Sequence, residues 1–98
     1  MLEVYHLLLK TKYRSQRKTT SPQKFWGTGK YNGESVTFWG VINDNIKRIT
    51  QIKPTSFAEG EKNMWKKLAK TESGYVEDSD RNVDYSQARV HDWVDEPG

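Results

Sequence analysis

Four short strand-like runs precede a single helix-like pattern, and this order most limits what the chain can fold into. β-Branched and aromatic residues such as those in these runs suit a pleated, half-buried surface. Asn32-Gly33 supplies the pair of positive φ angles that a tight hairpin needs. We therefore expect an antiparallel meander of about four strands. The runs are Val4–Leu9, Lys24–Trp26, Val36–Ile42 and Ile46–Lys53, and a second turn cluster is Asn43-Asp44-Asn45.

The pattern changes from strand to helix after Pro54. Ser56 and Glu59 have the spacing of a capping box, in which a serine oxygen accepts an early backbone N–H. Apolar residues then recur at helical spacing on one predicted face, and Gly74 supplies a left-handed stop. Because an exposed sheet face needs a cover, we expect an α+β fold in which this helix packs on the sheet. The predicted packing residues are Phe57, Met64, Trp65 and Leu68.

Charge is distributed unevenly along the 98 residues. Residues 1–70 contain 14 Lys and Arg against 5 Asp and Glu, a net charge of +9, whereas residues 71–98 contain 2 against 8, a net of −6. A basic body of this density favours polyanion partners, and an acidic tail can solvate or compete with such a partner. We expect one domain over residues 1–77 and an acidic tail over 78–98, partly docked or flexible.

Several classes of function are disfavoured by residue types. The chain has no cysteine, so disulfides, thiolate zinc sites and cysteine nucleophiles are excluded. His6 and His91 form no metal-ligand spacing, and neither a nucleophile with a base nor a phosphate-binding glycine loop can be placed. No export signal or membrane span is visible. We expect an intracellular, cytoplasmic protein that is not an enzyme and uses no cofactor, metal or membrane.

Gly40 interrupts the strand pattern "VTFWGVI" directly after Trp39. Glycine weakens a strand interior, so its presence there indicates a bulge or a close approach by another backbone or a ligand. Trp39 itself has two interpretations, a stacking platform for a base or sugar and a core side chain between sheet and helix.

The order of these motifs resembles the WGR domain, a module named for its Trp-Gly-Arg signature. The resemblance covers Val4 to Glu77 and rests on "KFW" from Lys24, "WGV" from Trp39, "SFAE" from Ser56, and Gly74-Tyr75. It implies a small free-standing WGR-like protein with an antiparallel sheet and one helix. It also implies that Trp39 lies against a DNA end, near a terminal sugar and phosphate, with Gly40 allowing that approach.

The chain departs from the family pattern immediately after the signature tryptophan. Val41 replaces the arginine, and Asn43-Asp44-Asn45 replaces the usual glycine-containing turn. The arginine links domains in the polymerase members of the family, so the departure implies that this chain lacks that coupling. Lys47 or Arg48 could restore positive charge from the next strand.

Together these observations predict a non-catalytic module that binds the DNA or RNA backbone through a basic face. Phosphate contacts supply affinity without sequence readout. The alternative is a protein–protein interaction adaptor without nucleic-acid binding, and a mobile-element protein that interferes with a host DNA enzyme is a third possibility. The predicted contacts are Trp39, Lys24, Lys47, Arg48 and Lys53, together with Lys12, Arg14, Arg17 and Lys18 of a long basic loop or arm.

Overall fold

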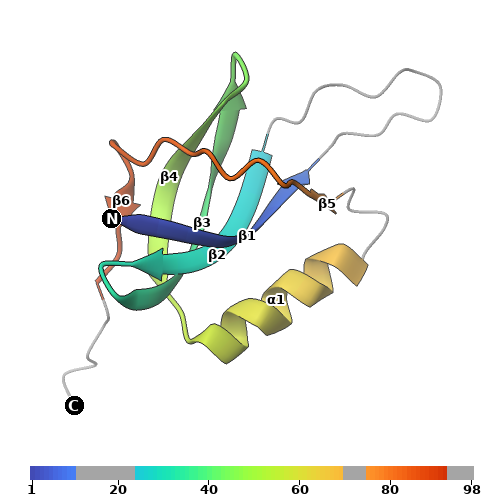
Figure 1. Ribbon diagram of the computed structural model, residues 1–98. Coiled ribbons are helices and arrows are strands. Elements are labelled where there is room, and N and C mark those ends of the chain that lie inside the picture. Colours follow the sequence, from blue (N-terminus) through green and yellow to red (C-terminus); the bar gives the residue numbers. More distant parts are fainter. Residues whose placement is uncertain (11–23, 70–74, 93–98) are drawn as a thin grey trace.

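The described residues of the protein form one six-stranded sheet with one helix (Figure 1). The computed structural model describes residues 1–10, 24–69 and 75–92. The sheet order is β5-β1-β2-β3-β4-β6; β6 is parallel to β4, and every other neighbouring pair is antiparallel. The elements are β1 (Leu2–Lys10), β2 (Lys24–Tyr31), β3 (Glu34–Asn43), β4 (Ile46–Pro54), α1 (Phe57–Ala69), β5 (Tyr75–Glu77) and β6 (Arg89–Val90).

The coarse prediction of an α+β fold containing a sheet is therefore confirmed, but the expected number of about four strands is too low. The two additional strands, β5 and β6, have only three and two residues. Both predicted turns are present: Asn32 and Gly33 have φ of 52° and 86°, and Asp44 and Asn45 have φ of 51° and 64°. Positive φ at both central residues is the geometry of a tight hairpin.

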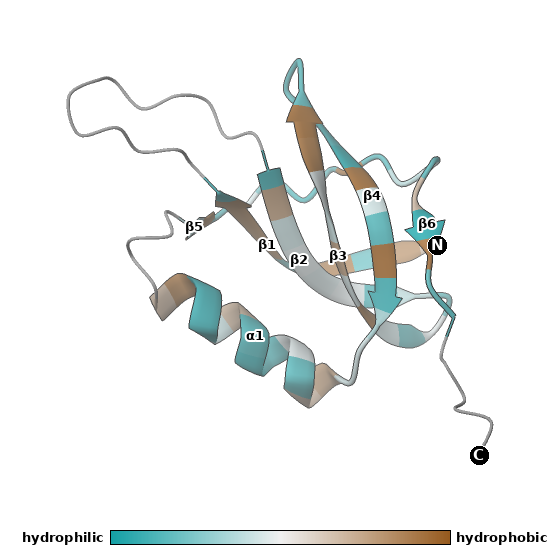
Figure 2. Ribbon diagram, turned by 180° about the vertical axis from the view of Figure 1, so that it is seen from behind, coloured by the Kyte–Doolittle hydropathy of each residue, from teal (hydrophilic) through white to brown (hydrophobic). Residues whose placement is uncertain are grey.

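Apolar side chains fill both faces of the sheet, because successive residues of a strand point to opposite sides. Leu7 and Phe25 belong to a cluster with Val36, Phe38, Ile49 and Ile52, whereas their neighbours Leu8 and Trp26 pack with Met64 of α1. Hydrophobic and hydrophilic bands alternate along β4 in Figure 2. We call the side with Leu8 and Trp26 the helix face and the side with Leu7 and Phe38 the opposite face.

Helix α1 covers part of the helix face and contacts β2, β3 and β5. Its start agrees with the predicted cap, since Ser56 Oγ accepts a hydrogen bond from Glu59 N at 3.2 Å. Gly60 and Met64 are its buried residues. A Cβ on Gly60 would lie 3.2 Å from Thr28 Cγ2, so the missing side chain lets the helix lie close to the sheet.

The predicted packing face of the helix is partly wrong. Trp65 and Phe57 are 62% and 58% exposed. Phe57 makes only an edge contact with Tyr5, at 6.4 Å between ring centroids. Met64 is buried and Leu68 packs beside it, as predicted. The buried stripe also passes through Gly60, which a pattern built on large apolar residues does not detect.

The C-terminal segment, defined here as residues 78–92, covers the opposite face. It starts beside β1, where Asp78 N donates to Leu7 O at 2.8 Å, and reaches β4, where Ile49 N donates to Asp84 O at 2.8 Å. Figure 1 shows it crossing the sheet between β5 and β6. Val83, Tyr85 and Ala88 pack against the Leu7 and Phe38 cluster. The part of the predicted tail that is described thus forms a second cover for the sheet. Gly74, Trp93 and Val94 lie outside the described residues.

Gly40 has a structural explanation within the sheet. The pairing of β3 with β4 shifts register between Trp39 and Gly40. A Cβ on Gly40 would overlap the backbone carbonyl of Arg48. The close approach predicted for this glycine is therefore made by β4 of the same chain.

Candidate nucleic-acid interface

Cationic side chains line up across one end of the helix face. The strand registers pair Lys10 with Lys24, Lys24 with Val41, and Val41 with Arg48. Lys24 and Val41 each lie two positions from the tryptophans Trp26 and Trp39, so they point to the same face. We call Lys10, Lys24 and Arg48 the cationic row.

The cationic row is accessible to a ligand. Lys24 is exposed, Lys10 is half-buried, and the Arg48 side chain is 55% exposed. One strand separates Lys24 from Arg48, which places their backbones about 10 Å apart. Within the described ranges, Lys24 makes no ion pair with a carboxylate. The row therefore places three cations, on β1, β2 and β4, along a span of four neighbouring strands.

Aromatic rings lie next to the cationic row. Lys67 Nζ lies 5.2 Å from the ring centroids of both Trp26 and Tyr75, and Lys10 Nζ lies 5.7 Å from that of Tyr75. Burial raises the pKa of the Tyr75 hydroxyl, which keeps the group neutral between its two ammonium neighbours. The C-terminal end of α1 thus adds a fourth cation to this part of the surface.

Trp39 lies in the next register row and is half-buried. It pairs with Trp26 on one side and Gln51 on the other. Its ring packs at the border of the Leu8 and Met64 cluster. It also stacks on His91, with centroids 6.4 Å apart and an interplanar angle of 30°. Trp39 is therefore a packing side chain with a partly accessible surface.

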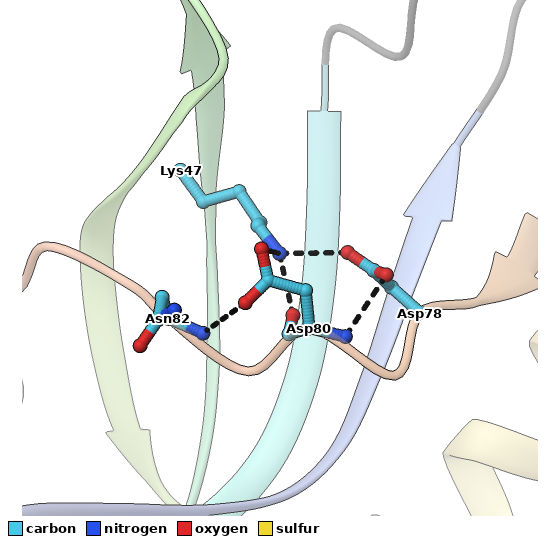
Figure 3. A network of polar contacts seen from close by, with 4 residues as sticks. All are labelled: Lys47, Asp78, Asp80 and Asn82. Atoms are coloured by element: carbon cyan, nitrogen blue, oxygen red, sulfur yellow. Dashed lines mark hydrogen bonds and ion pairs between the residues drawn. The ribbon is translucent and has the colours of Figure 1, made fainter.

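The Lys47 side chain, in contrast, is buried and bonded to other residues of the same chain (Figure 3). Its ammonium group donates to Asp78 Oδ2 at 2.6 Å and to the backbone carbonyl of Asp80 at 2.5 Å. Desolvation opposes the charge on Asp78, but hydrogen bonds from Lys47 and Asp80 N and the charge of Lys47 outweigh it, so the pKa of Asp78 is lowered. Lys47 holds the C-terminal segment to β4 and is not presented to an external phosphate.

The remaining predicted contacts fall into three situations. Arg48 Nε lies 4.0 Å from Asp84 Oδ2, a long and solvent-exposed pair. Lys53 is exposed but pairs in register with Thr37, roughly 16 Å along β4 from Arg48. It does not join the row. Lys12, Arg14, Arg17 and Lys18 lie outside the described residues.

A second ionisable cluster lies between β1, α1 and β5. The His6 ring lies 2.9 Å from Glu61 Oε2 through Nε2 and 3.6 Å from Glu77 Oε2 through Nδ1. A register shift between Val4 and His6 accompanies this position in β1. Among the residues described, no group of histidines and carboxylates has an arrangement that could hold a metal ion.

Comparison with models of protein families, with characterised proteins and with solved structures finds no significant match for this chain. The helix in the described part of the chain is neither long enough nor apolar enough to span a bilayer.

Sequence reasoning missed several residues of this surface. Lys67 and Tyr75 were not predicted as site residues, and His91 was considered only as a metal ligand. Their roles depend on which strands and helix turns become neighbours. The one available signal was the position of Lys10 and Lys24 at the two ends of the same basic loop, which suits a pair facing each other across a hairpin.

Proposed function

We propose that this chain is a non-catalytic nucleic-acid-binding module of the WGR-like kind, contacting the sugar-phosphate backbone through the cationic row. The observation that carries the proposal is the register that aligns Lys10, Lys24 and Arg48 on one accessible face. Trp39 in the adjacent row is the aromatic contact. Phosphate contacts position a nucleic acid, and aromatic rings stack on its bases or sugars.

The sequence between Lys10 and Lys24 contains the other predicted phosphate contacts. It carries Lys12, Arg14, Arg17 and Lys18 and begins and ends, through its covalent connections, at two members of the cationic row.

The test is a binding titration with labelled single-stranded DNA, single-stranded RNA and blunt duplex DNA across a range of salt concentrations. Each phosphate contact contributes a slope of roughly −0.7 to −0.9 to log K against log salt. Replacing Lys24 by Ala should therefore reduce the magnitude of the slope by about 1. Absence of measurable binding to all three probes at low salt would reject the proposal.

Lys30→Ala is the matched control, because Lys30 is exposed on the same strand at the opposite end. Its replacement removes the same charge from β2 and should leave the slope unchanged. An equal loss from Lys24→Ala and Lys30→Ala would show that net charge, and not the row, carries the binding.

A protein–protein adaptor is the second candidate, and the exposed aromatic residues of α1 favour it. Phe57 and Trp65 are more than half exposed. Residues of this type are enriched at protein interfaces. Neither side chain belongs to the cationic row, so Trp65→Ala should not alter oligonucleotide affinity. A partner that binds wild type and loses affinity with Trp65→Ala would support this role.

A further inference from the structure

The C-terminal segment contacts both Trp39 and Arg48, two of the residues that the proposed function assigns to nucleic acid. We propose that Asp84 and His91 act as a built-in competitor, in which a carboxylate takes the place of a phosphate and an imidazole the place of a base. This inference rests on the proposed function and concerns the regulation of the same surface.

His91 is held where a stacked base would lie. Its backbone N donates to Ile52 O at 2.8 Å, and its Nε2 lies 2.6 Å from Gln51 Oε1. Gln51 is the cross-strand partner of Trp39. Two contacts to β4 therefore orient the imidazole over the indole, at 6.4 Å and 30°. The imidazole is a flat nitrogen heterocycle, and it lies against the indole surface on which a nucleobase would stack.

Asp84 places a negative charge next to the cationic row. Its backbone bridges Lys47 and Ile49 of β4, which fixes the residue beside Arg48. Ser86 donates to Asp84 Oδ1 from Oγ at 2.7 Å and from its backbone N at 3.0 Å. These two hydrogen bonds lower the pKa of Asp84, with the charge of Arg48 adding to the effect. Asp84 is therefore an anion at neutral pH.

Both contacts can open without loss of the fold. The Arg48–Asp84 pair is long and exposed at 4.0 Å. The segment is also held to the sheet by backbone hydrogen bonds of Asp84 and His91, by Lys47 with Asp78, and by the packed side chains Val83 and Tyr85. None of these contacts uses the Asp84 carboxylate or the His91 ring. A nucleic acid can thus displace one carboxylate and one ring while the rest of the segment remains packed.

The experiment measures oligonucleotide affinity for His91→Ala and Asp84→Asn in the full chain. Removing a stacked ring should tighten binding roughly three- to ten-fold. Removing an exposed carboxylate should tighten it roughly two- to five-fold. Val90→Ala is the control for His91, because it shortens an exposed neighbour, and Glu3→Gln is the control for Asp84, because it removes the same charge elsewhere.

A second readout follows Trp39 without any nucleic acid. The indole N–H signal of Trp39, assigned through a Trp39→Phe variant, should shift in His91→Ala and remain unchanged in Val90→Ala. Binding that is measurable but no tighter in His91→Ala and Asp84→Asn than in their controls overturns the competitor and leaves the proposed function intact. Absence of binding in every variant overturns both.

Discussion

The two faces of the sheet are covered in different ways. On the helix face, α1 supplies regular cover over part of the sheet and leaves Trp39 and the cationic row partly accessible. On the opposite face, the C-terminal segment, which is mostly irregular chain, packs against the larger cluster that contains Leu7 and Phe38. A sheet can therefore be covered by irregular chain as well as by a helix. In this protein, Trp39 and the cationic row remain accessible on the face that α1 covers.

The largest expected effect comes from removing the irregular cover. A chain truncated after Glu77 exposes the cluster around Phe38 and leaves Lys47 without Asp78. Because small domains are marginally stable, we expect loss of cooperative thermal unfolding, measured by circular dichroism. The reference is a chain truncated after Asp92, which keeps the whole C-terminal segment. A melting transition at the same temperature in both chains would contradict a covering role for residues 78–92.

Competition between nucleic acid and the side chains of Asp84 and His91 has to be tested by single substitutions and not by this truncation. Deleting the segment removes Asp84 and His91 together with Val83, Tyr85 and Ala88 of the core. Any change in nucleic-acid affinity would then be mixed with unfolding.

The regular cover can be broken at one helix residue. Met64→Ala should lower the free energy of unfolding by about 3 kcal/mol, because a fully buried side chain is lost from the helix face. Trp65→Ala, on the next residue, should change it by no more than about 0.5 kcal/mol, because that ring is mostly exposed. Urea unfolding measures both. A larger loss of unfolding free energy from Trp65→Ala than from Met64→Ala would show that Trp65 packs against the sheet, as the sequence pattern predicted.

The attachment of the irregular cover depends on Lys47. Lys47→Met should cost about 2 kcal/mol, because the charge-assisted hydrogen bonds to Asp78 and Asp80 are lost while the aliphatic stem is kept. Lys53→Met, on the same strand, is the exposed control and should stay within about 0.5 kcal/mol. Equal unfolding curves for the two variants would show that the ion pair does not hold the segment.

The smallest expected effect is a dependence on acid. The pKa of Asp78 is lower in the folded chain, so its contribution is complete at neutral pH and is lost as pH falls through the folded pKa. The stability difference between wild type and Asp78→Asn should be on the order of 1 kcal/mol at neutral pH. It should shrink below about pH 4. A difference that grows on acidification has the wrong sign for this pair.

The sequence predicted the elements that carry a repeating pattern. The two hairpin turns followed from Asn32-Gly33 and Asp44-Asn45, and the helix followed from its cap and spacing. A glycine, in contrast, led to an error in the predicted packing face of the helix. Gly60 marks the closest part of the helix to Thr28, yet it carries no hydropathy signal, so Trp65 was placed in the core by a pattern that ignored it.

The site was predictable only in its residue types. Lys24, Arg48 and Trp39 are brought near one another by strand register, and the sequence does not fix register until the turns and the shift at Gly40 are known. Lys47 shows the limit most clearly. It is one residue from Arg48, and the alternation of the strand places it on the other side, where Asp78 receives it.

The sheet ends in two short strands, β5 with three residues and β6 with two. A long unpaired margin would present a row of free amide and carbonyl groups on which another molecule could add a strand. Margins this brief give an incoming strand little backbone to pair with. Along the parts of β1 and β4 that they pair with, they therefore discourage the addition of a strand from another copy.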